Sequence, residues 1–221
     1  MAVSKVITLV LLRHGETVAG SSTRYWGATD VALSEFGREQ MRRAAPFVAQ
    51  LGVGQVFTSC LSRTRDAAAI VAPQVPAIAL KELNEVNFGR WEGLTREQIA
   101  TAYPEEYARW QRRDQNFRYP GGESLVEFQR RIELALNRIL DSAAPTTLVV
   151  AHRGVIARLL AQLLHWDTTH MATLHIPLGS LHLLRRVADH VWKPERLDYT
   201  AHLDALRPVA AEEEAQPTTR N

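Results

Sequence analysis

The chain has 221 residues, of which 46% are hydrophobic and 23% charged, the composition of an ordinary globular protein. Its 26 basic and 24 acidic residues are dispersed, which argues against a nucleic-acid or membrane-surface partner and leaves a local basic pocket open. Cys60 is the only cysteine, which excludes an internal disulfide and a thiolate cluster for zinc or iron–sulfur chemistry and suits a reducing cytoplasm. No stretch approaches the roughly 20 apolar residues that span a bilayer, and we expect a cytoplasmic protein.

Aliphatic runs without polar alternation predict strands that are covered on both faces of a sheet. They are VITLVLL at residues 6–12 and TTLVVA at 146–151, GQVFTS at 54–59 is a weaker third, and SLHLLRRV at 180–187 predicts a further strand. Apolar residues recur at helical spacing over 36–51 and 155–164. Ser124, with Glu127 three residues later, forms a capping box and predicts where another helix begins.

Strands that alternate with helices predict an α/β protein, a three-layer α/β/α sandwich with an open, mostly parallel sheet and helices on both faces. We expect a single domain over residues 1–208. A polar, aromatic-rich stretch at about 95–120 predicts a helical excursion from the sheet. The last residues, 209–221, lose their apolar content and predict a disordered tail.

Ligands bind at the carboxyl ends of the strands in an open α/β sheet. The first strand ends at Arg13 and His14, the second leads into a helix with Arg63 in its first turn, and TTLVVA runs into His152 and Gly154. Two imidazoles and two guanidiniums gathered at one edge repel one another unless an anion lies between them. Arginine's planar fork, helix N-termini and a close-lying glycine backbone all suit phosphate oxygens. The sequence therefore predicts a phosphate site.

The histidines add reactivity to this site. A neutral imidazole can attack phosphorus and form a phosphoramidate, which splits a difficult hydrolysis into two easier steps. A second imidazole, protonated, can stabilise the equatorial oxygens. The leaving alkoxide needs a proton, and the loop at 80–94 offers Glu82, Glu85 and Glu92. A carboxyl group beside a bound phosphate dianion keeps its proton more readily and can act as a general acid, but spacing alone does not choose among the three.

Other catalytic classes lack their residues in this chain. Cysteine-dependent phosphatases need an arginine six residues after the cysteine, whereas Asp66 stands six residues after Cys60. The sequence contains no GxSxG elbow, no GxxxxGK[ST] loop and no HExxH motif. The remaining histidines show no tight metal spacing, and we expect them to be structural, with His202 left open as a neighbour of the site.

The chain carries an ordered series of motifs: LLRHGET, Arg24 ten residues beyond His14, TDVALSEFG, TSCLSRTRDAA, LNEVNFGRWEG, YPGGESLVEFQRRI and VVAHRGVI. This series resembles the histidine phosphatase superfamily, which includes the phosphoglycerate mutases. The resemblance implies that His14 is the nucleophile that becomes phosphohistidine, that Glu85 donates the proton, and that neither metal nor organic cofactor is needed. It implies phosphate-holding roles for Arg13, Arg63 and His152, and substrate contacts for Arg24 and Gly154.

One position departs from the family pattern. Many members carry an asparagine six residues after the histidine, which contacts the phosphate, and here that position is Gly20, followed by Ser21 and Ser22. Either a serine hydroxyl or a backbone amide takes over, or the pocket is looser. The bond to phosphorus does not depend on this residue, so the expected catalysis is kept.

Three functions follow for a chain of this kind. The first is a metal-independent hydrolase of a small phosphorylated metabolite, and the short middle region and PGGES segment resemble phosphatase branches such as the α-ribazole phosphatases. The second is a phosphoglycerate mutase-type isomerase, and the third is a module that binds a phosphorylated ligand without turnover. We expect a small phosphorylated substrate as the partner, no nucleic acid and no membrane, and the sequence leaves a homodimer open.

Overall fold

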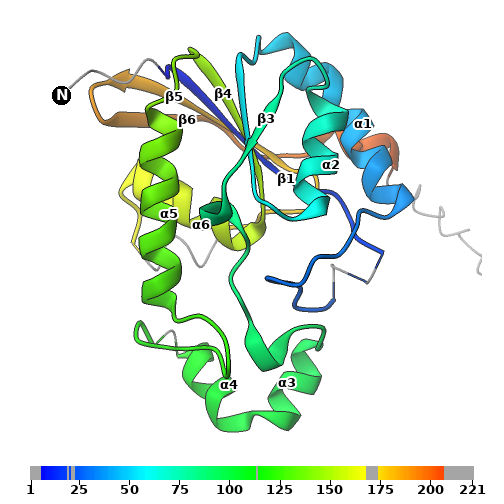
Figure 1. Cartoon of the computed structure of the whole chain (residues 1–221), viewed down its shortest axis with the longest axis vertical. Coiled ribbons are helices and arrows are strands. Elements are labelled where there is room, and N and C mark those ends of the chain that lie inside the picture. The colour runs from blue at the N-terminus through cyan, green and yellow to red at the C-terminus, as the bar shows by residue number, and fades with distance from the viewer. Residues whose placement is uncertain (1–5, 19, 21–22, 113, 168–173, 207–221) are drawn as a thin grey trace, which may run out of the picture.

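The computed structural model describes residues 6–18, 20, 23–112, 114–167 and 174–206, and its centre is a six-stranded sheet (Figure 1). The strands are β1 Thr8–Arg13, β2 Gln55–Thr58, β3 Ala77–Ala79, β4 Thr146–Ala151, β5 Leu181–Ala188 and β6 Val191–Tyr199. Their order is β3-β2-β4-β1-β5-β6. The first four are parallel, whereas β5 is antiparallel to β1 and β6 is antiparallel to β5. The sheet is therefore mixed, with a parallel part formed by β1–β4.

Helices cover both faces of this sheet, which confirms the predicted three-layer α/β/α architecture. The helices α1 Glu35–Gln50 and α2 Ser62–Val71 pack on one face, and α5 Leu125–Leu140 and α6 Arg153–Leu164 pack on the other (Figure 1). Two hydrophobic clusters result, one between each helix pair and the sheet. The fold class read from the sequence is correct.

The lack of alternation in the first strand follows from these two clusters. Leu9 and Leu11 belong to the cluster under α5 and α6, and Val10 and Leu12 belong to the cluster under α1 and α2. All four side chains are fully buried. Because successive strand residues point to opposite faces, a strand between two helix layers must be apolar at every position. This burial holds the end of β1 in a fixed place.

The helix predicted from its capping box begins as expected. Glu127 N–H donates to Ser124 Oγ at 3.1 Å, and Ser124 N–H donates to a Glu127 carboxylate oxygen at 2.9 Å. Two strands escaped prediction. β3 has three residues, all of them exposed, and β6 carries lysine, proline, glutamate and arginine on an edge of the sheet. β3 is apolar but only three residues long, and β6 lacks the apolar pattern that marks a buried strand.

The predicted excursion contains the short helices α3 Arg96–Ala102 and α4 Pro104–Gln111, which lie below the sheet in Figure 1. Aromatic side chains hold it together around Trp91, which is fully buried. The Trp91 ring meets those of Tyr25, Trp110 and Tyr119 edge to face, at centroid distances of 6.3, 6.0 and 5.3 Å. The predicted tail at 209–221 lies outside the described residues, so the domain boundary at residue 208 stays a prediction.

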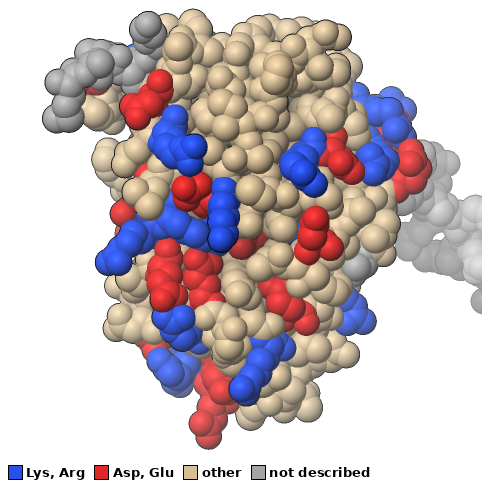
Figure 2. Space-filling model, in the orientation of Figure 1, with Lys and Arg blue, Asp and Glu red and all other residues tan. Residues whose placement is uncertain are grey.

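The surface in Figure 2 mixes charges of both signs, with acidic and basic side chains close together over the lower half of the view. In the part of the chain that the structure describes, no helix has both the length and the apolar character needed to cross a membrane.

Candidate active site

The sheet order brings three strand ends together. β2, β4 and β1 are neighbours and run parallel, so their carboxyl ends share one edge. His14 directly follows β1, His152 directly follows β4, and Arg63 lies in the first turn of α2 after β2. The two imidazole rings lie with their centroids 5.1 Å apart, and Arg63 Nε donates to His152 Nδ1 at 3.3 Å. We call Arg13, His14, Arg63 and His152 the phosphate cage.

His14 is 5% exposed, and its tautomer is set by the backbone. The Nδ1–H group donates to the carbonyl oxygen of Gly15 at 2.7 Å, so the lone pair of the neutral ring lies on Nε2. Burial lowers the His14 pKa well below its usual value, and the charges of Arg13 and Arg63 lower it further. The ring is therefore neutral at neutral pH, as a nucleophile requires.

Gly15 lets the chain turn close to α1. A Cβ atom at this position would lie 2.3 Å from the carbonyl oxygen of Gly37, which is closer than any real side chain allows. Glycine is therefore needed after His14 because the loop that carries the histidine packs directly on the first turn of the helix.

His152 is buried, and its ring meets both Arg63 and Ser59; its predicted role as a protonated stabiliser of the phosphate oxygens stays a prediction. Burial lowers its pKa well below the usual value, and the charge of Arg63 adds to this effect. Arg63 donates into the Nδ1 lone pair, which leaves the ring proton on Nε2, 2.9 Å from Ser59 Oγ. Ser59 is buried and was not predicted as part of the site, although it belongs to the same strand end as the TSCLSRTR motif.

The two guanidiniums of the cage are held by backbone carbonyls and not by carboxylates. Arg63 is 1% exposed and donates to Thr29 O at 2.9 Å and Gly27 O at 2.7 Å. Arg13 donates through one terminal nitrogen to Ile176 O at 2.6 Å, and burial lowers its pKa to about 10. Its Nε is buried and has no hydrogen-bond partner among the residues that the structure describes. A buried donor of this kind costs free energy until an acceptor arrives.

Of the three candidate carboxyls, the structure brings Glu85 to the cage. Its carboxylate accepts hydrogen bonds from Val86 N–H at 3.0 Å and from Gly154 N–H, at the start of α6, at 2.9 Å. A Cβ atom on Gly154 would lie 2.6 Å from Glu85 Oε1, so glycine is what allows this approach. Glu82 instead pairs with Arg138 at the surface, at 3.3 Å.

Glu92 has a different task, which the sequence did not reveal. Its two carboxylate oxygens accept hydrogen bonds from the backbone N–H groups of Gly27, Ala28, Thr29 and Phe88, at 3.0 to 3.3 Å. Glu92 therefore fixes the 27–29 loop, whose carbonyls hold Arg63. A lone glutamate in a glycine-rich loop gives no signal that would separate this role from a solvated surface position.

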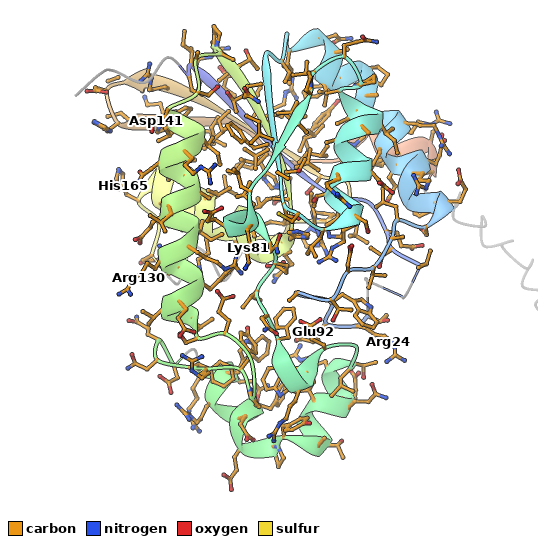
Figure 3. All side chains as sticks on the ribbon, viewed as in Figure 1. Arg24, Lys81, Glu92, Arg130, Asp141 and His165 are labelled. Atoms are coloured by element: carbon orange, nitrogen blue, oxygen red, sulfur yellow. The ribbon has the colours of Figure 1, made fainter. Side chains whose placement is uncertain are left out.

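Two other positions noted in the sequence form no hydrogen bond with a cage residue among the described residues. Arg24 is exposed and donates to Gly93 O at 2.7 Å and Gln98 Oε1 at 3.3 Å, and it projects at the edge of the molecule in Figure 3. Its contact with substrate stays a prediction. Gly20, which stands in place of asparagine, has φ +72 and thus uses the conformational freedom of glycine. Ser21 and Ser22 lie outside the described residues.

His202, left open by the sequence, is linked to the cage through backbone. Its Nε2 lies 3.0 Å from Gly179 O, and Gly179 N–H donates to His14 O at 3.2 Å. It therefore supports the loop behind the nucleophile and does not enter the cage itself.

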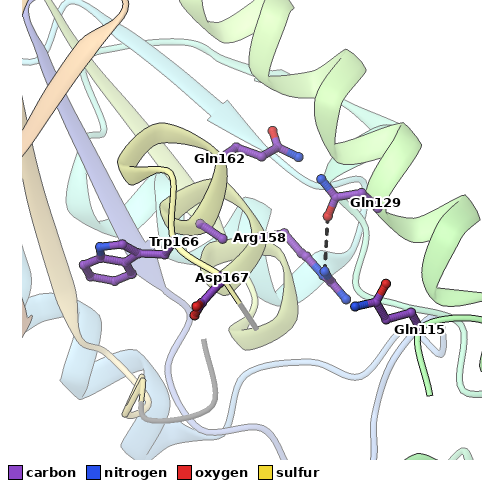
Figure 4. Close-up of a pocket in the computed structure, with 7 residues that line it drawn as sticks. Gln115, Gln129, Arg158, Gln162, Trp166 and Asp167 are labelled. Atoms are coloured by element: carbon purple, nitrogen blue, oxygen red, sulfur yellow. Dashed lines mark hydrogen bonds between the residues drawn. The ribbon is translucent and has the colours of Figure 1, made fainter. Parts of the chain in front are cut away.

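A separate cavity of about 360 Å³ lies between α5 and α6 (Figure 4). Five of its seven lining residues are polar, and Gln129 accepts a hydrogen bond from Arg158 at 3.2 Å across it. No residue of the phosphate cage lines this cavity. Among the described residues, no group of three histidine, cysteine, aspartate or glutamate side chains is arranged to hold a metal ion.

Comparison with known proteins places this geometry in a family. The model of the Histidine phosphatase superfamily (branch 1) matches residues 9–199. A bifunctional protein of Mycobacterium tuberculosis is 34% identical over 88% of the chain, which spans only about half (54%) of that protein. The adenosylcobalamin/α-ribazole phosphatase of Salmonella typhimurium is 35% identical, over 85% of the chain and 99% of that protein.

Solved structures agree with the sequence relatives. The α-ribazole phosphatase of Shigella flexneri superposes with a TM-score of 0.80 at 26% identity, covering 88% of the chain and 98% of that structure. The match over 9–199 includes both histidines, both cage arginines and Glu85. The chain therefore belongs to the histidine phosphatase superfamily, branch 1.

Proposed function

We propose that this chain is a phosphatase that hydrolyses a small phosphomonoester through a phosphohistidine at His14, without a metal ion. One observation carries the proposal: within the described part of the chain, the buried Arg13 Nε has no partner, and the two guanidiniums of its cage are anchored by carbonyls and not by carboxylates. Such a site keeps its positive charge for an anion that comes from outside.

The first chemical step is attack by His14. Nε2 of the neutral ring forms a bond to phosphorus while the bond from phosphorus to the leaving oxygen breaks, and the Gly15 carbonyl stabilises the proton on Nδ1 as the ring becomes positive. Arg13 and Arg63 take up the charge on the equatorial oxygens, and His152 joins them once its Nε2–H turns from Ser59 Oγ, its partner in this structure, to a phosphate oxygen. Glu85, in its protonated form, gives its proton to the leaving alkoxide.

The second step returns the enzyme to its starting state. The Glu85 carboxylate, held by the Val86 and Gly154 amides, takes a proton from a water molecule, which attacks phosphorus. The bond between phosphorus and His14 Nε2 breaks, and inorganic phosphate leaves. Glu85 thus acts as an acid in the first step and as a base in the second. The positive charge that stabilises the phosphate oxygens in both steps comes from Arg13 and Arg63.

Relatives named as phosphatases support hydrolysis over transfer to an acceptor, because α-ribazole phosphatases match nearly over their full length. The substrate of this chain need not be theirs, since the sequences are 26 and 35% identical. We therefore propose the reaction class and treat α-ribazole phosphate as one member of the substrate panel.

The test is release of inorganic phosphate from a panel of phosphomonoesters in the presence of EDTA, with acid-labile phosphohistidine trapped by rapid quench. We expect turnover in EDTA and a labelled His14, and we expect His14→Ala to lose both by at least about 10⁴-fold. Wild-type rates in His14→Ala would overturn the mechanism. Interconversion of 2- and 3-phosphoglycerate faster than phosphate release would replace the hydrolase with a mutase, and binding without any release would replace it with a binding module.

A further inference from the structure

We infer that Arg153 is a specificity-determining residue, and that it binds a second anionic group of the substrate beside the phosphate that is transferred. The inference rests on the proposed phosphatase function and extends it to the substrate class. It assigns a role to the residue between His152 and Gly154, which neither the sequence motifs nor the cage had used.

Arg153 lies between two residues of the site. It is the first residue of α6, directly after the buried His152 and directly before Gly154, whose amide holds Glu85. Its neighbours on both sides are thus fixed at the cage, while Arg153 itself is exposed. The side chain therefore belongs to the rim of the cage, on the side of the proposed proton donor and hence of the leaving group.

Electrostatic effects locate its charge more closely. Besides burial and Glu85, the group with the largest influence on the Arg13 pKa is Arg153, which lowers it more than Arg63 does. The Tyr25 pKa is raised mainly by burial, and Arg96 and Arg153 lower it. The Arg153 guanidinium therefore lies near enough to act on both Arg13, inside the cage, and Tyr25, which packs against Trp91.

No acidic side chain neutralises this charge. In the described part of the chain, no hydrogen bond or ion pair engages Arg153, and each carboxylate near the cage is already occupied. Glu85 is held by backbone amides, Asp30 accepts hydrogen bonds from Ser62, and Glu92 accepts hydrogen bonds from the 27–29 loop. An unpaired arginine next to two other arginines is unfavourable unless the ligand supplies the missing negative charge.

The charge balance indicates how much is missing. The two histidines are neutral, so Arg13 and Arg63 match a phosphate dianion, and Glu85 carries no charge when it is protonated as a general acid. Arg153 is then one positive charge in excess. A carboxylate or a second phosphate on the leaving group balances it, and the planar guanidinium can bind either with two hydrogen bonds.

The experiment uses matched ligand pairs that differ in one anionic group. The pairs are 3-phosphoglycerate with glycerol 3-phosphate for a carboxylate, and fructose 1,6-bisphosphate with fructose 6-phosphate for a phosphate. Affinities are measured by calorimetry, and kcat/KM by phosphate release, for wild type, Arg153→Ala and Arg153→Lys. Arg130→Ala is the control, because Arg130 is also exposed but projects outward from α5 at the left of the view in Figure 3.

In wild type we expect at least about tenfold preference for the member with the extra anionic group in one of the pairs, which is about 1.4 kcal/mol. Arg153→Ala should reduce this ratio to near one, Arg153→Lys should keep part of it, and Arg130→Ala should keep all of it. The pair that responds tells a carboxylate from a second phosphate. α-Ribazole 5′-phosphate, whose phosphate is its only anionic group, should gain nothing from Arg153.

A ratio near one in wild type for both pairs, or equal ratios in wild type and Arg153→Ala, would overturn the inference. Those results would leave the proposed function intact if p-nitrophenyl phosphate is still hydrolysed through phosphohistidine. Conversely, a ratio that depends on Arg153 in calorimetry, without turnover of any substrate, would retain the anion subsite and reject the phosphatase.

Discussion

Glu92 and Arg63 hold the same loop from opposite sides. Glu92 accepts hydrogen bonds from the N–H groups of Gly27, Ala28 and Thr29, and Arg63 donates to the carbonyls of Gly27 and Thr29. The carboxylate and the guanidinium thus act on one another through peptide groups, which are polarised in the direction that favours both. The position of an arginine in the cage therefore depends on a glutamate that does not enter it.

Glu92→Ala should destabilise the fold by roughly 2 kcal/mol, because several backbone amides lose a charged acceptor. It should also lower kcat at least about tenfold, because the carbonyls that orient Arg63 are released. Urea unfolding and phosphomonoester kinetics measure the two effects. Glu82→Ala is the control, since Glu82 makes only a surface ion pair with Arg138, and it should change the free energy of unfolding by about 0.5 kcal/mol or less. Equal effects of the two substitutions would contradict the positioning role.

Gly154→Ala should move the proton donor without touching the nucleophile. The new methyl group would lie 2.6 Å from Glu85 Oε1, so the carboxyl must shift away from α6. We expect kcat/KM, which reports only formation of the phosphohistidine, to fall about 10- to 100-fold for an alkyl phosphate, whose leaving oxygen needs a proton. The loss should be several-fold smaller for p-nitrophenyl phosphate, which leaves without one, and Glu85→Gln should show the same pattern. An identical loss for both substrates would rule out Glu85 as the general acid.

Arg63→Lys should be far from conservative. Arg63 makes three hydrogen bonds in different directions, to Thr29 O, Gly27 O and His152 Nδ1, and a single ammonium group cannot reproduce this arrangement. We expect kcat/KM to drop about 100-fold or more, with thermal unfolding at lower temperature. Arg65→Lys, two residues along the same helix and exposed, should behave as wild type. Retention of activity by Arg63→Lys would show that charge alone is sufficient in the cage.

The protein should lose stability below about pH 6.5. Burial lowers the pKa of His14 and His152 well below the usual value, and lowers that of His182 to about 4. Below about pH 6.5 the unfolded chain takes up protons at these histidines while the folded chain does not. The free energy of unfolding therefore decreases as the pH is lowered. At pH 5 each fully shifted histidine contributes a loss of up to roughly 2 kcal/mol.

This pH dependence can be assigned by substitution. His182→Gln should flatten the dependence between pH 7.5 and 5, as measured by urea unfolding, whereas His190→Gln, at an exposed turn, should leave it as in wild type. A free energy of unfolding that stays constant or rises towards pH 5 would show that the buried histidines accept protons in the folded chain.

Much of this molecule could be predicted from sequence because its main signals are local. The uninterrupted aliphatic residues of β1 and the Ser124 capping box each depend on a few adjacent positions, and topology then brings Arg13, His14, Arg63 and His152 to one edge. The choice among Glu82, Glu85 and Glu92 could not be made in this way. All three lie in one loop, and only the path of that loop decides which carboxyl group reaches α6.

The remaining gaps have a similar cause. β3 and β6 lie at the two edges of the sheet; β3 is too short, at three residues, to give a strand pattern, and β6 is exposed enough to carry charged residues and a proline. The low pKa of His152 comes from burial and from the charge of Arg63, which lies 89 positions away in the sequence. Arg24 shows the opposite case, in which a motif position is recognisable although the side chain in this structure binds Gly93 and Gln98.

The reversal of direction at β5 has an evolutionary consequence. Because β5 runs against β1, the chain reaches the catalytic edge just before this strand begins, and there Ile176 O and Ser180 O accept hydrogen bonds from Arg13 while Gly179 N–H donates to His14 O. These contacts are made by peptide groups, which every residue supplies. Apart from Gly179, whose φ of +74 favours glycine, this segment is free to diverge between family members while its grip on the nucleophile persists.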